Sequence, residues 1–236
     1  MMLQRYDRSM FCEPVRLNLG AGIQQAPRWI NYDRSRTAYL ARSRVARRSA
    51  CLANALGLTS TRELLPWPPD TRVHDLTNGI PHTAESVDAI YSSHMLEHID
   101  PASAELILRE CHRVLKPGGV LRIVVPDLES AARAYVEGDR GYFPSHETAI
   151  ADAFIDTLYL RPAPKGGRLE RTIRAVLRTD DGGHKWMYDA ESLILRVRRA
   201  GFTDVERVAA GSGRDPETAK LDSRSTQHVH LEAFKS

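Results

Sequence analysis

The sequence is poor in cysteine. Its three cysteines, Cys12, Cys51 and Cys111, are odd in number and far apart, and no Cys-x-x-Cys pair occurs. This distribution argues against a disulfide framework and against a zinc site built from cysteines. We therefore expect each cysteine to behave as a small apolar residue, and the sequence predicts no metal site.

Long apolar runs are also missing. No stretch approaches the roughly 18 residues of a membrane-spanning helix, and the segment Met1 to Asp7 lacks the apolar stretch of a signal peptide. Both absences favour a cytoplasmic protein without a membrane span. The length of 236 residues suits one α/β domain with insertions. We expect a single domain over 1–236, with its core at 15–127 and 186–236 and variable helical insertions at about 36–66 and 129–185.

Neither sign of charge dominates the chain, because the formal net charge is only +3. That value is too small to indicate nucleic-acid binding by itself. The arginines are nevertheless concentrated in two stretches, which hold Arg34, Arg36, Arg42, Arg44, Arg47 and Arg48 in the first and Arg161, Lys165, Arg168, Arg171, Arg174 and Arg178 in the second. We interpret both clusters as solvated helix faces. The alternative is that an anionic substrate or polymer binds there.

Seven short segments have the composition of β-strands, and helical patterns separate several of them. The expected strands are 15–19, 29–33, 73–76, 87–92, 120–125, 205–208 and 228–234. The clearest helix follows Pro101, where apolar residues recur at helical spacing after Asp100, a suitable capping residue. Further helices are expected within 39–56 and after Asp189. This alternation predicts an α/β fold with a doubly wound, mostly parallel sheet, helices on both faces and a helical insertion near the C-terminal half.

A turn of small residues, Gly20-Ala21-Gly22, follows the first expected strand. Such residues let a ligand approach the backbone closely. The turn lacks the third glycine of the dinucleotide-binding fingerprint, since that position is Gln25. Positions 38–62 also contain no Asp or Glu, where that fingerprint needs an acid for the ribose. A nicotinamide-dependent enzyme is therefore disfavoured.

Polar residues follow three other expected strands, and parallel strands of such a sheet end at one edge. Asp33 is placed to accept hydrogen bonds from two ribose hydroxyls, although it could instead cap the next segment. Asp75 could accept from an adenine amino group while Leu76 packs on the ring, and an ordinary turn aspartate is the alternative. The stretch Ser92-Ser93-His94 completes this expected rim.

Five motifs occur in order and with consistent spacing. They are LNLGAG at 17–22, WINYD at 29–33, HDLTNGIP at 74–81, SVDAIYSSHMLEH at 86–98 and ECHRVLKPGGVLRIVVPD at 110–127. This series resembles the class I methyltransferases of the broad type-11 group over about residues 15–127. The stretch GHKWMYD at 183–189 and the turn at 201–202 extend the resemblance weakly toward the C-terminus. The resemblance implies a Rossmann-like fold and S-adenosyl-L-methionine as methyl donor.

The resemblance also assigns the rim residues to parts of this cofactor. It implies that the glycine turn approaches the methionine and ribose portion and that Asp33 holds the ribose. It also implies that Asp75 and Leu76 contact the adenine. The stretch 92–94 then faces the reacting centre. The complete expected cofactor-binding set is Asn18, Gly20, Ala21, Gly22, Asp33, Asp75, Leu76, Ser92 and Ser93.

Two features depart from the pattern of these relatives. Many of them carry an acid where this chain has Asn18, whose amide still donates and accepts hydrogen bonds but adds no charge. The gap between Gly22 and Asp33 is short. We therefore expect the first helix of the fold to be brief or absent.

Two histidines are the expected catalytic residues. His94 is the first candidate for a general base, because a neutral imidazole is available near pH 7; the alternative is a structural bond within the next helix. His184 is the second, and together with Tyr188 it is expected to close the pocket from the far side. We expect His98 to pack or to position its neighbours, and Trp186 to belong to the core.

The expected function is transfer of a methyl group to an unidentified small molecule or biosynthetic intermediate, with oxygen as the acceptor atom. One alternative is a methyltransferase that acts on RNA or an acidic glycan. The other is a non-catalytic binding subunit with the same fold. No recognisable nucleic-acid-binding module is present, which disfavours a nucleic-acid partner. Oligomeric state is not readable from the sequence.

Overall fold

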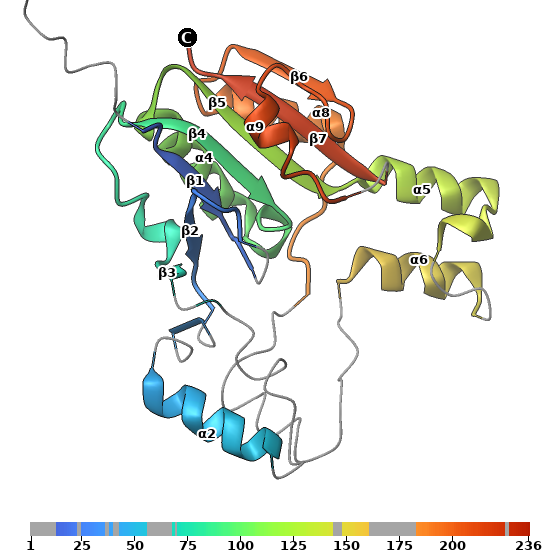
Figure 1. Ribbon diagram of the computed structural model, residues 1–236. Coiled ribbons are helices and arrows are strands. Elements are labelled where there is room, and N and C mark those ends of the chain that lie inside the picture. The colour runs from blue at the N-terminus through green and yellow to red at the C-terminus, as the bar shows by residue number, and fades with distance from the viewer. Residues whose placement is uncertain are drawn as a thin grey trace, which may run out of the picture.

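The computed structural model describes residues 13–22, 25–35, 38–39, 43–55, 68, 70–143, 148–160, 183–224 and 227–236. Its centre is a seven-stranded sheet in the order β3-β2-β1-β4-β5-β7-β6. The strands are β1 (Arg16–Leu19), β2 (Ile30–Asp33), β3 (Arg72–Val73), β4 (Val87–Ser93), β5 (Leu115–Pro126), β6 (Asp204–Val208) and β7 (His228–Phe234). The pairs from β3 to β5 are parallel, and β7 is antiparallel to both β5 and β6. The predicted Rossmann-like, mostly parallel sheet is confirmed (Figure 1).

One face of the sheet is covered by the helices α4 (Pro101–Val114) and α8 (Ala190–Arg199). Both start where the sequence predicted a cap: Asp100 accepts from the Ser103 amide, and Asp189 forms a capping box with Ser192. The helices bury apolar residues against alternate positions of the strands, because side chains of a strand point to opposite faces in turn. This is the main hydrophobic core.

The opposite face has a different cover. No helix occurs among the described residues between β1 and β2, which are 20–22 and 25–29. Ala26 and Trp29 pack there against Tyr91 and Val124, and Leu221 joins them from a later segment. The short helix α9 (Pro216–Ala219) lies on this face (Figure 1). The expected shortness of the first helix agrees with these residues.

Several boundaries differ from the expectation. The third strand ends at Val73, because Asp75 caps a 3-10 helix over Leu76–Asn78 instead of extending the strand. The fifth strand begins at Leu115, before the Pro-Gly-Gly stretch that was expected to separate it from α4. Helix α2 (Arg44–Ala55) falls within the expected range 39–56. Trp186 is 43% exposed, so its assignment to the core was wrong.

Two helices occupy the described part of the expected insertion. They are α5 (Leu128–Glu137) and α6 (Ile150–Leu158), which pack on each other through Ala134, Phe143 and Ala153 beyond one end of the sheet (Figure 1). Residues 161–182, which include the second arginine cluster, lie outside the described residues, as do Arg36, Arg42 and the side chain of Arg47. Within the described part of the chain, no helix is long and apolar enough to cross a membrane.

Candidate active site

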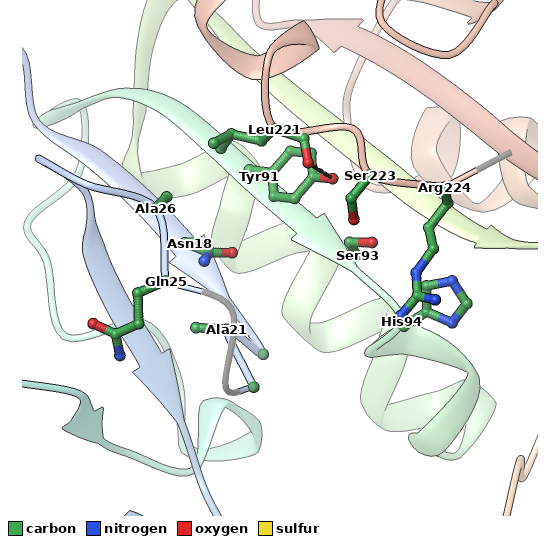
Figure 2. A pocket seen from close by; sticks show the side chains of 12 residues that line it. Asn18, Ala21, Gln25, Ala26, Tyr91, Ser93, His94, Leu221, Ser223 and Arg224 are labelled. Carbon is green, nitrogen blue, oxygen red and sulfur yellow. Dashed lines mark hydrogen bonds between the residues drawn. The ribbon is translucent and has the colours of Figure 1, made fainter. Parts of the chain in front are cut away.

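A pocket of about 310 Å³ opens at the carboxyl ends of β1 and β4, on the face that lacks a helix between β1 and β2 (Figure 2). Four of its residues belong to the expected cofactor set, Asn18, Gly20, Ala21 and Gly22, and a fifth is Ser93. The candidate base His94 also lines it. The remaining lining residues are Gln25, Ala26, Tyr91, Leu221, Ser223 and Arg224.

The glycine turn is shaped by its backbone. Gly20 and Gly22 have φ values of 68° and 56°, a region that side chains disfavour. A Cβ atom on Gly20 would lie 2.6 Å from Cβ of Met95, so this position also has no room for a side chain. The turn is tied to β2, because the Ala21 amide donates to the Tyr32 carbonyl and the Gly22 amide donates to Asp33 Oδ2.

A buried amide pair supports the floor of the pocket. Asn18 Nδ2 donates to Asn31 Oδ1 at 2.9 Å, and the same oxygen accepts from the Ala26 amide at 3.0 Å. Asn31 in turn donates to the Ala26 and Trp29 carbonyls. Asn18 therefore holds the segment that replaces the first helix, a role that an acid at this position could not fill in the same way because a carboxylate has no donor.

Asp33 lies at the end of β2, beside the glycine turn. Its two carboxylate oxygens accept from the amides of Gly22, at 3.1 Å, and Ser35, at 2.7 Å. The side chain itself is not among the lining residues of the pocket. Its position next to Gly22 is compatible with the expected ribose contact, which stays a prediction.

Asp75 and Leu76 also do not line the pocket. Asp75 accepts from the amide and hydroxyl of Thr77, at 3.0 and 2.7 Å, and Arg34 lies 3.5 Å away. Burial alone would raise the pKa of Asp75, but these hydrogen bonds and the arginine charge hold it below its usual value. The structure thus shows Asp75 as a capping residue and Leu76 as a buried one, and their adenine contact stays a prediction.

The end of β4 alternates between the two faces. Tyr91 and Ser93 line the pocket, whereas Ser92 is buried on the other side with no hydrogen-bond partner for its hydroxyl in the described residues. The expectation that Ser92 faces the pocket therefore differs from the structure. Tyr91 was not among the expected site residues, although the period of two along a strand places it on the same face as Ser93. Tyr91 donates to the Leu221 carbonyl at 3.0 Å, and burial raises its pKa to about 12.

His94 follows β4 in a left-handed conformation, with φ of 53°. A non-glycine residue held there by its surroundings is common at functional sites. Its Nδ1 lies 3.1 Å from Glu97 Oε1, while Nε2 is buried and has no hydrogen-bond partner among the described residues. Both expected roles thus meet in one residue, since His94 contacts the next helical turn and also lines the pocket.

His184 and Tyr188 lie elsewhere. Neither lines the pocket, contrary to the expectation that they close it. The His184 ring packs against His98 and Tyr159, with centroids 4.9 and 5.4 Å apart. Tyr188 is 1% exposed and belongs to the main core. A catalytic role for His184 stays a prediction that the pocket geometry does not support.

Three pocket residues come from the segment before β7, more than a hundred residues after the glycine turn. Leu221, Ser223 and Arg224 flank Asp222, whose fully buried carboxylate forms an ion pair with Arg122 of β5. Asp222 Oδ2 also accepts from His230 Nδ1, if that nitrogen carries the proton, and from the Gly211 amide. No local motif marks this segment, because its place depends on a pairing between strands distant in sequence.

The pocket fits the cofactor that the resemblance implies. Its volume lies in the range of small-molecule sites, about 300–1,000 Å³. The Gly20 Cβ position is closed by Met95, so only glycine keeps this wall of the turn in place. Among the twelve lining residues, Arg224 alone carries a permanent charge and could receive a carboxylate (Figure 2).

Comparison with known proteins gives a family match over part of the chain. Residues 17–123 match the family model described as a methyltransferase domain. None of the curated proteins matches the chain significantly. Similar solved structures include the S-adenosylmethionine-dependent methyltransferase SibL in its apo form (17% identity, TM-score 0.46, 94% of this chain and 50% of that chain). Others are a possible histamine N-methyltransferase from Thermotoga maritima (14%, 0.42, 97% and 85%) and PigF with SAH (17%, 0.42, 98% and 52%).

The chain spans about half the length of SibL and of PigF. With TM-scores below 0.5, these structures add no detail to the site, and the family match carries the assignment. The ordered motifs and the matched segment cover the same strands, from β1 into β5. Residues 17–123, less than half of the chain, therefore match a methyltransferase domain, in agreement with the resemblance to the class I, type-11-like group.

Proposed function

We propose that this protein is an enzyme that transfers a methyl group from S-adenosylmethionine to a small-molecule acceptor, with oxygen as the acceptor atom. The observation that carries the proposal is one pocket that joins the glycine turn of β1 to His94 after β4. In a sheet of this class, ligands bind at the carboxyl ends of the strands. The same pocket can therefore receive the donor on one side and the acceptor on the other.

The chain's own residues would bind and orient the two reactants. The cofactor supplies a methyl group on a sulfonium, which is already reactive toward nucleophiles. Gly20 and Gly22 allow close approach of the backbone, and Asp33 offers carboxylate oxygens to the ribose hydroxyls. Alignment of donor and acceptor in a site that excludes water supplies most of the acceleration in such a reaction.

His94 would remove the proton of a hydroxyl acceptor. The Glu97 carboxylate beside Nδ1 favours the tautomer with a proton on that nitrogen, which leaves Nε2 as the proton acceptor. Nε2 is buried, unpartnered and part of a residue that lines the pocket. A base is needed for a hydroxyl or a protonated amine and less so for a carboxylate, so this geometry favours one of the first two acceptors over a carboxylate.

The direct test is calorimetric titration with S-adenosylmethionine and with its demethylated product. We expect both to bind, and Asp33→Asn to weaken binding about tenfold to a hundredfold because a charge-assisted contact is worth about 1.5–3 kcal/mol. Asp204→Asn is the matched control, since Asp204 is exposed on β6 and pairs with Arg214. No binding of either ligand at millimolar concentration would refute the proposal.

A second experiment tests the proposed base role with the variant His94→Gln. We expect this variant to bind the cofactor as the parent does but to transfer methyl groups to hydroxyl acceptors about 10²–10⁴-fold more slowly, the usual contribution of a general base. Equal rates in the parent and the variant would contradict a role of His94 as general base. Cofactor binding without transfer to any screened acceptor would favour the non-catalytic alternative. The polymer alternative rests on sequence alone, because most of the arginine clusters lie outside the described residues.

A further inference from the structure

A cluster of three ionisable side chains lies next to the pocket but outside it. Glu97 and His98 belong to the 3-10 helix Leu96–His98, and His184 comes from the segment before α8. One ligand atom from each lies within 4.8 Å of the other two. None of the three lines the pocket.

Backbone hydrogen bonds bring the distant histidine to this place. The Lys185 amide donates to the Glu97 carbonyl at 2.7 Å, and the His184 amide donates to the Tyr159 carbonyl at 2.8 Å. The segment that carries His184 is thus fixed between the end of α6 and the 3-10 helix. The cluster is a built feature of the fold rather than a chance approach of mobile surface groups.

The carboxylate of Glu97 is fully buried, with no exposed surface. Neither of its oxygens has a hydrogen-bond partner in the described part of the chain, although His94 Nδ1 lies 3.1 Å from Oε1 without hydrogen-bond geometry. Burying an ionised carboxylate without compensation is costly, so such groups are paired or coordinate metals. This side chain therefore points to a missing positive partner.

Both histidines present the nitrogen that a metal ion needs. His98 Nδ1 lies 3.2 Å from the Gly183 carbonyl, and His184 Nδ1 lies 2.8 Å from the Leu158 carbonyl. A carbonyl only accepts, so each Nδ1 carries the proton and each Nε2 keeps its lone pair. Metal-binding histidines in proteins are held by this same type of contact.

We propose that Glu97, His98 and His184 bind a divalent transition-metal ion, and that the ion is zinc. Two imidazoles and one carboxylate form a ligand set that zinc accepts, with a fourth position left for water. Tetrahedral zinc with bonds of about 2.1 Å places its ligands roughly 3.4 Å apart. The side chains would then draw together by about 1.4 Å or less from their present separation of up to 4.8 Å.

This proposal does not depend on methyl transfer. The ion would neutralise the buried carboxylate and join the 3-10 helix to the segment before α8. It differs from the expectation of no metal site, which considered cysteine ligands. The ligands here are histidine and glutamate from segments far apart in sequence.

The experiment titrates tag-free protein, first stripped with a chelator, with zinc chloride by calorimetry and with cobalt(II) by visible absorption. We expect one equivalent of zinc, and a tetrahedral cobalt spectrum that zinc abolishes. Glu97→Gln and His184→Ala should each weaken zinc binding at least about tenfold, in the range seen when metal sites are disturbed. His82→Ala is the matched control, because His82 pairs with Tyr32 of β2 and does not belong to the cluster. This variant should bind zinc as the parent does.

The outcomes separate the proposal from its rivals. No stoichiometric zinc on the parent protein, or equal binding by the parent and both variants, would overturn it. If one variant fails to fold, judged by circular dichroism, the other variant and zinc X-ray absorption on the parent decide. Absorption that shows no nitrogen ligands would likewise overturn it. Failure of zinc binding with intact cofactor binding would leave the proposed function untouched.

Discussion

Gly20 illustrates how a single residue can be fixed by two separate constraints. Its φ of 68° disfavours any side chain, and Met95 occupies the space that a Cβ would need. Gly118 has a similar φ of 77°, but nothing lies within 4 Å of its Cβ position. A comparison of the two positions therefore separates the effect of backbone strain from the effect of crowding.

We expect Gly20→Ala to lower the free energy of unfolding by more than Gly118→Ala does. Left-handed strain costs about 1–2 kcal/mol in both variants, and overpacking against Met95 adds about 1–3 kcal/mol at Gly20 alone. Urea denaturation of both variants measures the difference. Equal losses would show that Met95 moves away without cost.

At the residue scale, the sequence predicted the parts of the site that follow strands. The glycine turn, Ser93 and His94 were expected and line the pocket. Leu221, Ser223 and Arg224 were missed, because their position follows from the ion pair of Asp222 with Arg122, and an ion pair between distant residues leaves no local pattern. Ser92 was misplaced because Ser92 and Ser93 were both expected to face the cofactor. Neighbouring residues of a strand point to opposite faces of the sheet.

The segment between β6 and β7, which contains the short helix α9, is firmly anchored by a buried ion pair. Asp222 and Arg122 are fully buried, and Glu232 lies 3.8 Å from the same guanidinium. Asp204 and Arg214 form an ion pair of 2.8 Å nearby, but both side chains are about half exposed. Burial, rather than distance, distinguishes the two pairs.

We expect Asp222→Ala to destabilise the protein by about 3–5 kcal/mol, because it breaks a buried ion pair and leaves the Arg122 charge with only the more distant Glu232 carboxylate. Asp204→Ala should cost less than about 1 kcal/mol, since exposed pairs contribute little. Chemical denaturation at neutral pH measures both. Similar costs for the two variants would contradict the view that burial decides.

The ion pair of Asp222 with Arg122 predicts that the stability of the fold depends on pH. Burial would raise the pKa of Asp222, but hydrogen bonds from His230, Arg122 and Gly211 hold it below its usual value. A depressed pKa stabilises the fold above the unfolded value of about 3.9 and loses this contribution as pH falls below it. The stability gap between the parent and Asp222→Asn should therefore be full at pH 6–7 and shrink below about pH 4.

Elements whose ends carry their own signals were the easiest to predict. Helices α4 and α8 start at the expected aspartates, which cap them. The short β3 was harder, because Asp75 turns the chain into a 3-10 helix through bonds to Thr77. Local capping is visible in a sequence, whereas the choice between a strand and a turn depends on the neighbouring strand.

At the scale of the whole molecule, the main core runs across the sheet from Leu17 of β1 to Leu231 of β7. Such continuity supports the proposal that one domain extends over the core segments. A ligand that binds only the folded state then stabilises everything that unfolds with the pocket.

We expect a single thermal unfolding transition, whose midpoint temperature rises when S-adenosylmethionine binds. At about one hundred times the dissociation constant the ligand adds about 2.7 kcal/mol, which corresponds to roughly 5–11 °C for a domain of this size. Differential scanning calorimetry with and without ligand measures the shift. Two transitions, of which only one moves, would contradict a single cooperative domain.

The overall order of strands and helices was predictable because parallel sheets alternate the two along the chain. The position of β7 between β5 and β6 was not, since both partners are antiparallel to it and the pairing joins residues far apart in sequence. The segment that completes the pocket precedes this strand.

The place of β7 has a consequence for synthesis on the ribosome. β6 emerges before β7, yet among the described strands it pairs only with β7, so it has none of these partners until the later strand leaves the exit tunnel. The block from β1 to β5 can assemble earlier, as N-terminal parts commonly do. Arg122 of β5 has no carboxylate partner until Asp222 and Glu232 have been synthesised. A nascent chain paused before His228 would expose an incomplete sheet to chaperones.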